Sequence, residues 1–403
     1  MHDLFQAGQK IHLTLYKKIV INYIMESCIS EEELKEKIIN ALKEQGFKIN
    51  PHVRPSGRSK RTLRRIQSKS RIEQLSLHKN FLQKNLNIVK TFCKDGKEIK
   101  PDRISLELRE VISGTLEEIL FRWWNFIWWS IPYQRSYGRQ MRFILWDTTH
   151  NMPFGLILLQ SPVLKMYVRD KYLEIPKEEL DLWVNRSMHA QRVGALPPYN
   201  ELLGGKMVAL ALTSNEVREV YRRKYNSSKT IIKGRFIPPD LLFITTTSAF
   251  GKSSLYNRLK YDGEIVAESL GYTKGSGSFH ISEELYLELL NFLAQKGVDI
   301  SRGFGHGPSR KLKLISLAFK YLGLPKYEFH GIQREFFLFP LVKNLKEVIK
   351  MGEEPIYIDR PFNELVEYWR FRWALPRAER KPDWRKFEVK KLFKHVEHTL
   401  KEL

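Results

Sequence analysis

The chain has 403 residues and carries 68 Lys and Arg against 45 Asp and Glu, for a formal net charge of +23. This length allows a sizeable core and about two or three domains, and the excess of positive charge favours a polyanionic partner, most simply nucleic acid. A membrane span, a secretory signal, a disulfide framework and a thiolate zinc site are all excluded by the pattern, so we expect a cytoplasmic protein without a membrane partner.

Residues 1–100 are predicted to form a helical, basic, nucleic-acid-binding region. Residues 16–46 place apolar side chains at helical spacing, and Ser30 with Glu33 resembles a capping box. The end of this pattern at Gly46 resembles the turn from a helix into an extended segment in small winged-helix domains. We therefore expect helices before the first strongly basic stretch.

The stretch from Arg54 to Arg71 is the strongest electrostatic feature, because it contains no acidic residue. Arg61, Arg64 and Arg65 would share one face of a helix, and such a face can follow a phosphate backbone. A solvated arm without a partner is the alternative. The candidate nucleic-acid-binding residues of this stretch are Arg54, Arg58, Lys60, Arg61, Arg64, Arg65, Lys69 and Arg71.

Residues 101–135 are expected to form a Trp-rich connecting helix. Apolar residues from Leu106 to Leu120 recur at helical spacing, and four tryptophans follow between Trp123 and Trp129. Aromatic side chains can stack on unpaired bases, but tryptophans clustered on one helix are more often buried. We favour packing over nucleic-acid contact.

Residues 136–285 are predicted to form a central α/β domain that begins with two strands, Met141–Trp146 and Phe154–Leu159, joined by a polar hairpin. Asp147 ends the first strand, where a ribonuclease H-like fold offers a metal carboxylate. A nuclease or transposase would use Mg²⁺ there, but it needs further carboxylates that the next buried strand does not supply. Asp147 could instead bond its own turn.

The junction after the buried run Leu241–Ile244 concentrates polar and glycine-rich chemistry. The sequence predicts a loop through Gly251 and a helix over Ser253–Lys260, which would present backbone N–H groups to a phosphate. It is not a Walker A loop, because Thr246 stands where that motif requires glycine. The alternative is that a serine here merely caps the helix.

Candidate site residues follow from this junction and from the glycine turns after it. If the protein is an enzyme, a question that the sequence leaves open, the candidate catalytic residues are Tyr256, Asp147 and His280. The candidate phosphate-pocket residues are Ser248, Lys252, Ser253, Arg258, Arg302, His306 and Arg310.

The glycine turn Leu203-Gly204-Gly205-Lys206, which opens a helix after several strands, resembles the GCN5-related N-acyltransferase fold. That resemblance implies a pyrophosphate cradle at the turn and a general acid at Tyr256. Glu201 and Lys206 stand where that family has Gln or Arg and Gly or Ala, which argues against bound acyl-coenzyme A.

Residues 286–403 are predicted to form a C-terminal α/β extension with a basic aromatic tail. Its helices are expected over Ser282–Lys296 and Lys311–Leu322, and a strand over Phe336–Pro340. In the tail, Arg370, Arg372 and Arg377 are expected to contact phosphates.

Several blocks together resemble the DruA proteins of the Druantia anti-phage defence system. The blocks are GRQMRFILWDTTHNMPFGLILLQSP, TTTSAFGKSSLYNRLKY, GFGHGPSRKLKLISLAFKYLGL, HGIQREFFLFPL and YWRFRWALPRA. The resemblance implies a prokaryotic protein of defence islands or mobile elements that acts on or near DNA, and it carries over no catalytic residue.

The sequence thus predicts a mixed α/β protein with a helical basic N-terminal region, a central mixed sheet and a helical C-terminal region. Its expected function is DNA binding in anti-phage defence or mobile elements, with other defence-system proteins as candidate partners. A transposase-like or nuclease-like enzyme and an acyltransferase-like enzyme stay open as alternatives.

Overall fold

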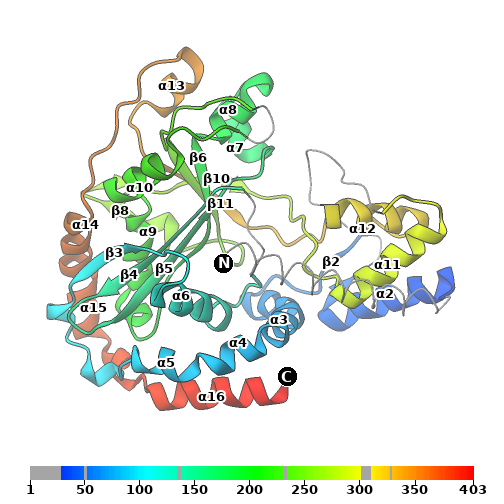
Figure 1. The fold of residues 1–403 in the computed structure, drawn as a ribbon, viewed down its shortest axis with the longest axis horizontal. Helices are drawn as coiled ribbons and strands as arrows, with labels where there is room; N and C mark the ends of the chain where they lie inside the picture. The colour runs from blue at the N-terminus through cyan, green and yellow to red at the C-terminus, as the bar shows by residue number, and fades with distance from the viewer. Residues whose placement is uncertain (1–28, 50–51, 134–137, 231–233, 301–309, 327–328) are drawn as a thin grey trace. The chain divides into compact units, whose positions relative to one another are not determined.

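The computed structural model describes residues 29–49, 52–133, 138–230, 234–300, 310–326 and 329–403 (Figure 1). The chain divides into two compact units. The first unit combines the residues up to Glu73 with Lys274–Ile332, and the second combines Gln74–Thr273 with Gln333–Leu403. Each unit therefore contains segments that are distant in sequence.

The first unit is mainly helical. Helix α2 begins after Ser30, whose hydroxyl accepts a 3.2 Å hydrogen bond from the N–H of Glu33, and it ends at Gly46 with a φ of 100°. This is the capping chemistry that the sequence predicted. The likeness to a winged-helix domain stays a prediction. The elements of this unit are α2 (Glu31–Gln45), β1 (Phe47–Lys48), β2 (Arg54–Pro55), α3 (Lys60–Leu77, up to Glu73), α11 (Glu283–Gln295) and α12 (Arg310–Tyr321).

A seven-stranded mixed sheet forms the centre of the second unit, in the order β10-β11-β7-β6-β5-β4-β3. All neighbouring strands are antiparallel except β6 and β7, which are parallel. The central mixed sheet is thus confirmed. Its strands are β3 (Leu106–Glu110), β4 (Gln140–Asp147), β5 (Met152–Gln160), β6 (Ser187–Ala195), β7 (Phe243–Thr247), β10 (Glu268–Tyr272) and β11 (Glu335–Pro340), and a separate hairpin joins β8 (Lys260–Tyr261) to β9 (Glu264–Ile265).

Helices surround this sheet and dominate the end of the chain, as predicted. A π-helical segment at Arg370–Ala374 joins α14 to α15. None of the helices that the structure describes is long and apolar enough to cross a membrane. The α-helices are α4 (Lys79–Lys84), α5 (Leu86–Thr91), α6 (Leu116–Ile127), α7 (Tyr167–Tyr172), α8 (Leu180–Val184), α9 (Gly204–Ala211), α10 (Asn215–Tyr225), α13 (Leu345–Met351), α14 (Phe362–Trp369), α15 (Leu375–Arg380) and α16 (Val389–Glu402).

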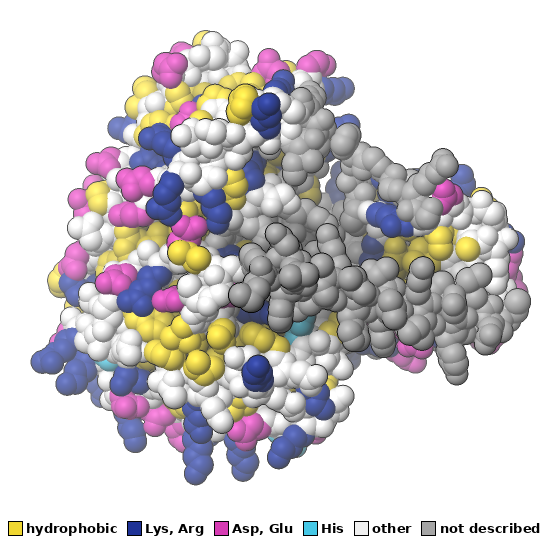
Figure 2. Space-filling view, viewed as in Figure 1, with side chains coloured by type: hydrophobic (Ala, Val, Ile, Leu, Met, Phe, Trp, Pro, Cys, Tyr) yellow, Lys and Arg dark blue, Asp and Glu magenta, His cyan; other side chains and the backbone are white. Residues whose placement is uncertain are grey.

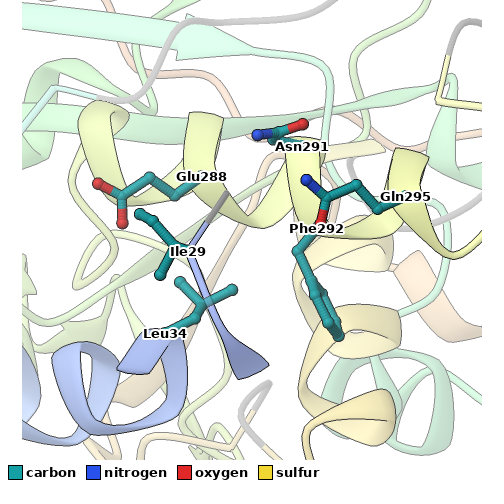
Figure 3. A pocket seen from close by; sticks show the side chains of 6 residues that line it. All are labelled: Ile29, Leu34, Glu288, Asn291, Phe292 and Gln295. Carbon is teal, nitrogen blue, oxygen red and sulfur yellow. The ribbon is translucent and has the colours of Figure 1, made fainter. Parts of the chain in front are cut away.

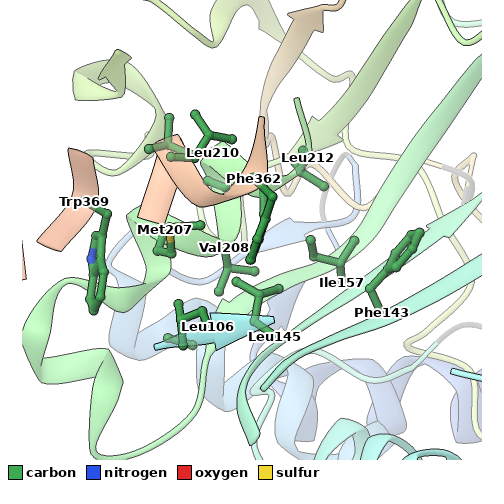
Figure 4. Packing of buried hydrophobic residues seen from close by; sticks show 14 of the residues in the cluster. Leu106, Phe143, Leu145, Ile157, Met207, Val208, Leu210, Leu212, Phe362 and Trp369 are labelled. Carbon is green, nitrogen blue, oxygen red and sulfur yellow. The ribbon is translucent and has the colours of Figure 1, made fainter. Parts of the chain in front are cut away.

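Both faces of the sheet are covered by apolar side chains. Along β4, Phe143 and Leu145 join the core beneath α9 and α14 (Figure 4), whereas Ile144 and Trp146 join a second core with residues of α6 and α16. Successive strand residues point to opposite faces, so a strand buried on both faces shows no apolar–polar alternation. This explains the continuous apolar runs in the sequence.

Two predicted helices are wrong in part. Residues 106–110 form strand β3, paired with β4, and helix α6 begins only at Leu116. Leu106 and Leu108 are two residues apart, which fits a strand as well as a helix, and pairing with β4 decided between them. The predicted packing of the tryptophans is confirmed for Trp123 and Trp124, which are fully buried.

The helix predicted over Ser253–Lys260 is also wrong. A single 3-10 turn forms at Tyr256–Arg258, and the chain then enters the β8–β9 hairpin. Backbone and side-chain groups at the start of this segment bond to another strand of the sheet, described below, so the segment does not continue as a helix. The dipole argument for a phosphate at this junction therefore loses its basis.

Candidate functional site

Asp147 is completely buried at the β4–β5 hairpin, and its carboxylate accepts hydrogen bonds from neighbouring groups of the protein. One oxygen accepts from the N–H groups of Thr149 (3.1 Å) and His150 (3.2 Å), and the other from the Tyr199 hydroxyl (2.7 Å). The Nδ1 of His150 donates to that second oxygen at 2.6 Å, because its Nε2 accepts the N–H of Lys100. Asp147 thus bonds its own turn.

The hydrogen-bonded groups around this hairpin have a structural role. Burial, and then the adjacent Asp147, raise the pKa of Tyr199 well above its usual value, so its hydroxyl stays a donor. Within the described residues, no three His, Cys, Asp or Glu side chains come together as a set that could hold a metal ion. A Mg²⁺ site at Asp147 therefore stays a prediction.

The Ser/Gly junction after β7 surrounds an anion that belongs to the protein, the carboxylate of Glu335 on β11. The N–H of Ser253 and the side-chain amide of Asn257 each donate to one oxygen at 2.8 Å, and the Ser269 hydroxyl donates to the other at 2.8 Å. The hydroxyl of Ser248 accepts the N–H of Glu335 at 3.0 Å. Ser248 and Ser253, two of the residues expected to face a phosphate, thus bond Glu335 instead, and no sequence pattern pointed to Glu335.

Tyr256 lies under this junction with its ring against Phe337 and Phe339 of β11. Burial raises its pKa to about 12, although a hydrogen bond to Thr246 acts in the opposite direction. A neutral, buried phenol is a weak nucleophile, because only the deprotonated form attacks readily. Lys252, in the same loop, is exposed.

His280 lies in the first unit, whereas Asp147 and Tyr256 lie in the second. Its ring packs among Phe47, Phe279 and His330, with ring centroids 5.0–5.3 Å apart. Burial, followed by the neighbouring His330, lowers the pKa of His280 well below its usual value. The ring is therefore neutral near pH 7.

The remaining members of the predicted phosphate pocket are Arg310, Arg302, His306 and Arg258. Arg310 is exposed at the start of α12 in the first unit, and Arg302 and His306 lie outside the described residues. Arg258 belongs to a different hollow of the second unit, described below.

The basic stretch of the first unit does form a helix over most of its length. Arg61, Arg64 and Arg65 are exposed on α3, while Leu63 and Ile66 are buried behind them. Lys69 lies 3.8 Å from a carboxylate of the same unit, Glu44. Arg71 is half-buried, and desolvation lowers its pKa. The exposed cations of this stretch, which we call together the α3 basic face, are Arg54 on β2, Arg58 in the segment before α3, and Lys60, Arg61, Arg64, Arg65 and Lys69 on α3.

The three arginines predicted in the C-terminal tail differ in environment. Arg370 donates to the carbonyl of Ile104 at 3.2 Å and pairs with Glu367, and Arg377 donates to the carbonyl of Glu201 at 3.1 Å. These two side chains therefore connect segments of the second unit that are distant in sequence. Arg372 is exposed and has no carboxylate partner among the described residues.

Arg372 lines a hollow of about 360 Å³ in the second unit, within the range of small-molecule sites. Four cations line it, and no Asp or Glu appears among the described residues of its wall. We call this hollow the basic pocket. Its lining residues are Lys206, Arg258, Lys260, Gly263, Tyr368, Arg372 and Trp373.

Packing of α14 on α9 assembles the basic pocket. The indole N–H of Trp369 donates to the carbonyl of Leu203 at 3.2 Å, and Trp369 and Met207 face the same core in Figure 4. This contact brings the π-helical segment after α14 to the start of α9. The glycine turn predicted to open a helix is confirmed, since α9 begins at Gly204.

Lys206 is the most constrained cation of the basic pocket. Its Nζ donates to the carbonyl of Arg258 at 3.2 Å and lies 4.1 Å from the ring centroid of Trp373. Burial, and then the positive charges of Arg258 and Arg372, lower its pKa. Like charges that converge without an acid favour an anionic ligand. Tyr368, Trp373 and Lys260 were not singled out from the sequence, because nothing local links them to Lys206.

A small hollow in the first unit, between α2 and α11, offers no comparable site (Figure 3). Its volume is about 10 Å³, which holds at most about one water molecule. Its lining residues are Ile29, Leu34, Glu288, Asn291, Phe292 and Gln295.

The visible face of the second unit shows Lys and Arg interspersed with Asp and Glu rather than gathered in one band (Figure 2). The net charge of +23 is therefore not spread as one continuous basic surface over this face. Local groups of cations, rather than the overall charge, have to be considered for binding.

Comparison with known proteins gives two matches and one negative result. The family described as Druantia protein DruA matches residues 57–351. The chain is 33% identical over 382 residues to "Druantia protein DruA" of Escherichia coli (strain UMEA 4076-1), covering 93% of this chain and 94% of that protein. No solved structure matches, and the likeness to the GCN5-related N-acyltransferase fold stays a prediction.

Proposed function

The chain belongs to the Druantia protein DruA family, and from this premise we propose that it binds DNA as a component of an anti-phage defence system. The observation that carries the proposal is the α3 basic face, with its seven exposed cations between Arg54 and Lys69. Other proteins of the same defence system are its proposed partners.

The geometry of α3 supports contact with a phosphate backbone. Arg61, Arg64 and Arg65 are spaced so that their side chains leave the same side of the helix, opposite the buried Leu63 and Ile66. The rise of an α-helix places Arg61 and Lys69 about 12 Å apart along the axis. Several phosphate charges fall within that length of duplex DNA. Guanidinium groups bind phosphate through paired hydrogen bonds, which adds to the charge attraction.

The alternative activities have less support from the contacts described. A strand-cleaving or strand-joining activity would need the carboxylate of Asp147 to bind a metal, but its oxygens already accept hydrogen bonds from Thr149, His150 and Tyr199. A role in a mobile element has the family resemblance as its support.

An electrophoretic mobility shift at increasing salt tests the proposal. The triple variant Arg61→Gln/Arg64→Gln/Arg65→Gln should reduce the slope of log affinity against log salt by about 2.7, since each lost phosphate contact removes about 0.9. The matched control, Lys390→Gln/Lys394→Gln/Lys401→Gln, removes three exposed charges from α16 and should keep the slope.

Circular dichroism should show equal helix content in both triple variants, because all six side chains are exposed. DNA affinity of the wild type that stays constant between about 50 and 200 mM salt would contradict phosphate-dominated binding. Equal slopes in the α3 variant and the wild type would remove the α3 basic face from the interface.

A further inference from the structure

The cations that line the basic pocket are not balanced by carboxylates among the described residues of its wall. Lys206, Arg258, Lys260 and Arg372 come from three separate segments of the second unit and line one hollow. None of the four pairs with an Asp or Glu among the described residues. Bringing like charges together costs free energy; the pKa of Lys206 is lowered first by burial and then by the charges of Arg258 and Arg372. An anion in the hollow would offset that cost.

We propose that the basic pocket binds a small ligand with a chain of two or three phosphate groups, of the class of nucleoside di- and triphosphates. The proposal is independent of DNA binding by the α3 basic face. A phosphate ester carries about −1.5 to −2 charges near pH 7, so one phosphate would leave the four cations only half neutralised. A chain of phosphates matches their charge.

The form of the pocket favours a small ligand over a polymer. Its volume of about 360 Å³ lies in the size range of small-molecule sites, and the hollow opens to solvent. Lys206 is half-buried at the start of α9, so its ammonium lies in the wall of the pocket rather than on an exposed surface. The cations of α3, by contrast, lie along one exposed helix.

The backbone that carries Arg372 has a feature common at functional sites. Residues 370–374 form a π-helical segment between α14 and α15. Pro376 has no N–H to donate to the carbonyl of Arg372, as the fourth residue on would do in an α-helix. The widened turn therefore has a local cause in the sequence, and it places Arg372 and Trp373 side by side in the pocket wall.

The aromatic side chains indicate which part of the ligand is recognised. The Lys206 ammonium lies 4.1 Å from the Trp373 ring centroid, and the rings of Trp373 and Tyr368 are nearly perpendicular with centroids 5.3 Å apart. The ammonium thus occupies one face of the Trp373 ring, and the side chain as a whole is buried. We infer that the phosphates carry the recognition, so that inorganic triphosphate and nucleoside triphosphates bind within about tenfold of one another, a difference of about 1.4 kcal/mol.

Isothermal titration calorimetry of the full chain tests the proposal with three probes in magnesium-free buffer: inorganic triphosphate, ATP and a single-stranded oligonucleotide. The variant Lys260→Gln/Arg372→Gln should weaken both triphosphates by at least about tenfold, because charge-assisted contacts are the stronger hydrogen bonds. The control Lys390→Gln/Lys394→Gln removes two equally exposed charges and should leave both affinities unchanged.

Three results would overturn the proposal. The first is that neither triphosphate binds the wild type at millimolar concentration, and the second is that the pocket variant binds both as the wild type does. The third is that the pocket variant loses only oligonucleotide affinity, which would make the hollow a polymer contact. The Arg61→Gln/Arg64→Gln/Arg65→Gln variant should keep triphosphate binding, so failure of DNA binding can be told from failure of the pocket.

Discussion

The α3 basic face and the basic pocket both gather positive charge, but they present it differently. Along α3 the cations follow one another in sequence and stand in solvent. In the pocket they come from α9, the turn before β8, β8 itself and the segment after α14. An extended exposed row suits a polymer of phosphates, whereas a hollow suits a compact anion. In our proposal, the shape of each region, more than its total charge, separates the two kinds of ligand.

A third anion site is already filled from within the protein. At the Ser/Gly junction, the carboxylate of Glu335 accepts from Ser253, Asn257 and Ser269. The junction has the chemistry of an anion site, and its anion comes from β11. In the sequence, an anion site that is open to a ligand therefore looks like one that is occupied by a carboxylate of the protein itself.

A change in salt concentration should produce the largest difference in ligand affinity between the two basic regions. Raising salt from about 50 to 200 mM should weaken DNA binding by about 10³, the loss typical of six or more phosphate contacts. Triphosphate binding should weaken less than DNA binding, because four cations meet a small ligand that lacks the condensed counterions of a polymer. Parallel titrations of the two ligands at each salt concentration measure this, and equal losses would erase the distinction.

Removing the internal anion should destabilise the second unit without affecting either ligand. Glu335→Ala removes a buried carboxylate that accepts three hydrogen bonds, and we expect a loss of about 2 kcal/mol in the free energy of unfolding, because hydrogen bonds to a charged group are the stronger ones. Chemical denaturation measures this loss, with Glu379→Ala at an exposed carboxylate as the control. A stability equal to that of the control would mean that Glu335 does not hold the junction.

The pH dependence of triphosphate binding should reflect the ionisation of Lys206. Binding needs the ammonium form, and the pKa of Lys206 lies below its ordinary value, so affinity should start to fall at a lower pH than for an ordinary lysine. The arginines beside it, Arg258 and Arg372, stay charged throughout, and Lys260 faces the same hollow. We expect triphosphate affinity to fall about tenfold once Lys206 is neutral. This loss corresponds to a difference of about one unit between the pKa of Lys206 in the free and in the bound protein.

The Lys206→Arg variant provides the control for this pH series. Its guanidinium keeps its charge, so affinity should stay nearly constant over the range in which the wild type declines. The ionisation of the ligand is common to both proteins and cancels in their ratio. Parallel curves for the two proteins would show that Lys206 does not contact the phosphates.

The smallest effect is expected for Tyr256→Phe, close to the basic pocket in sequence but buried beneath the junction. Loss of its hydrogen bond to Thr246 should cost about 1 kcal/mol of stability. Neither triphosphate nor DNA affinity should change. Thermal unfolding and the two binding measurements check this, and a large loss of binding with normal stability would return Tyr256 to a functional role.

Elements with strong local patterns were predictable from the sequence. The β4–β5 hairpin, the helices α11 and α12 and the glycine turn before α9 occur where periodicity and turn residues indicated them. Strand β3 was not predictable, because Leu106 and Leu108 fit both periods and only the partner strand selected one. The missing helix after Ser253 has the same kind of cause, since a distant carboxylate binds its first N–H.

The sequence by itself determined the family, the excess of positive charge and the basic face of α3, since all three depend on residues close together in the chain. Tertiary structure decided which anion each other group of polar residues meets. Glu335 reaches the N–H of Ser253 across 82 residues, and Trp369 binds the carbonyl of Leu203 across 166. Such contacts arise from strand order and helix packing, which local periodicity does not encode.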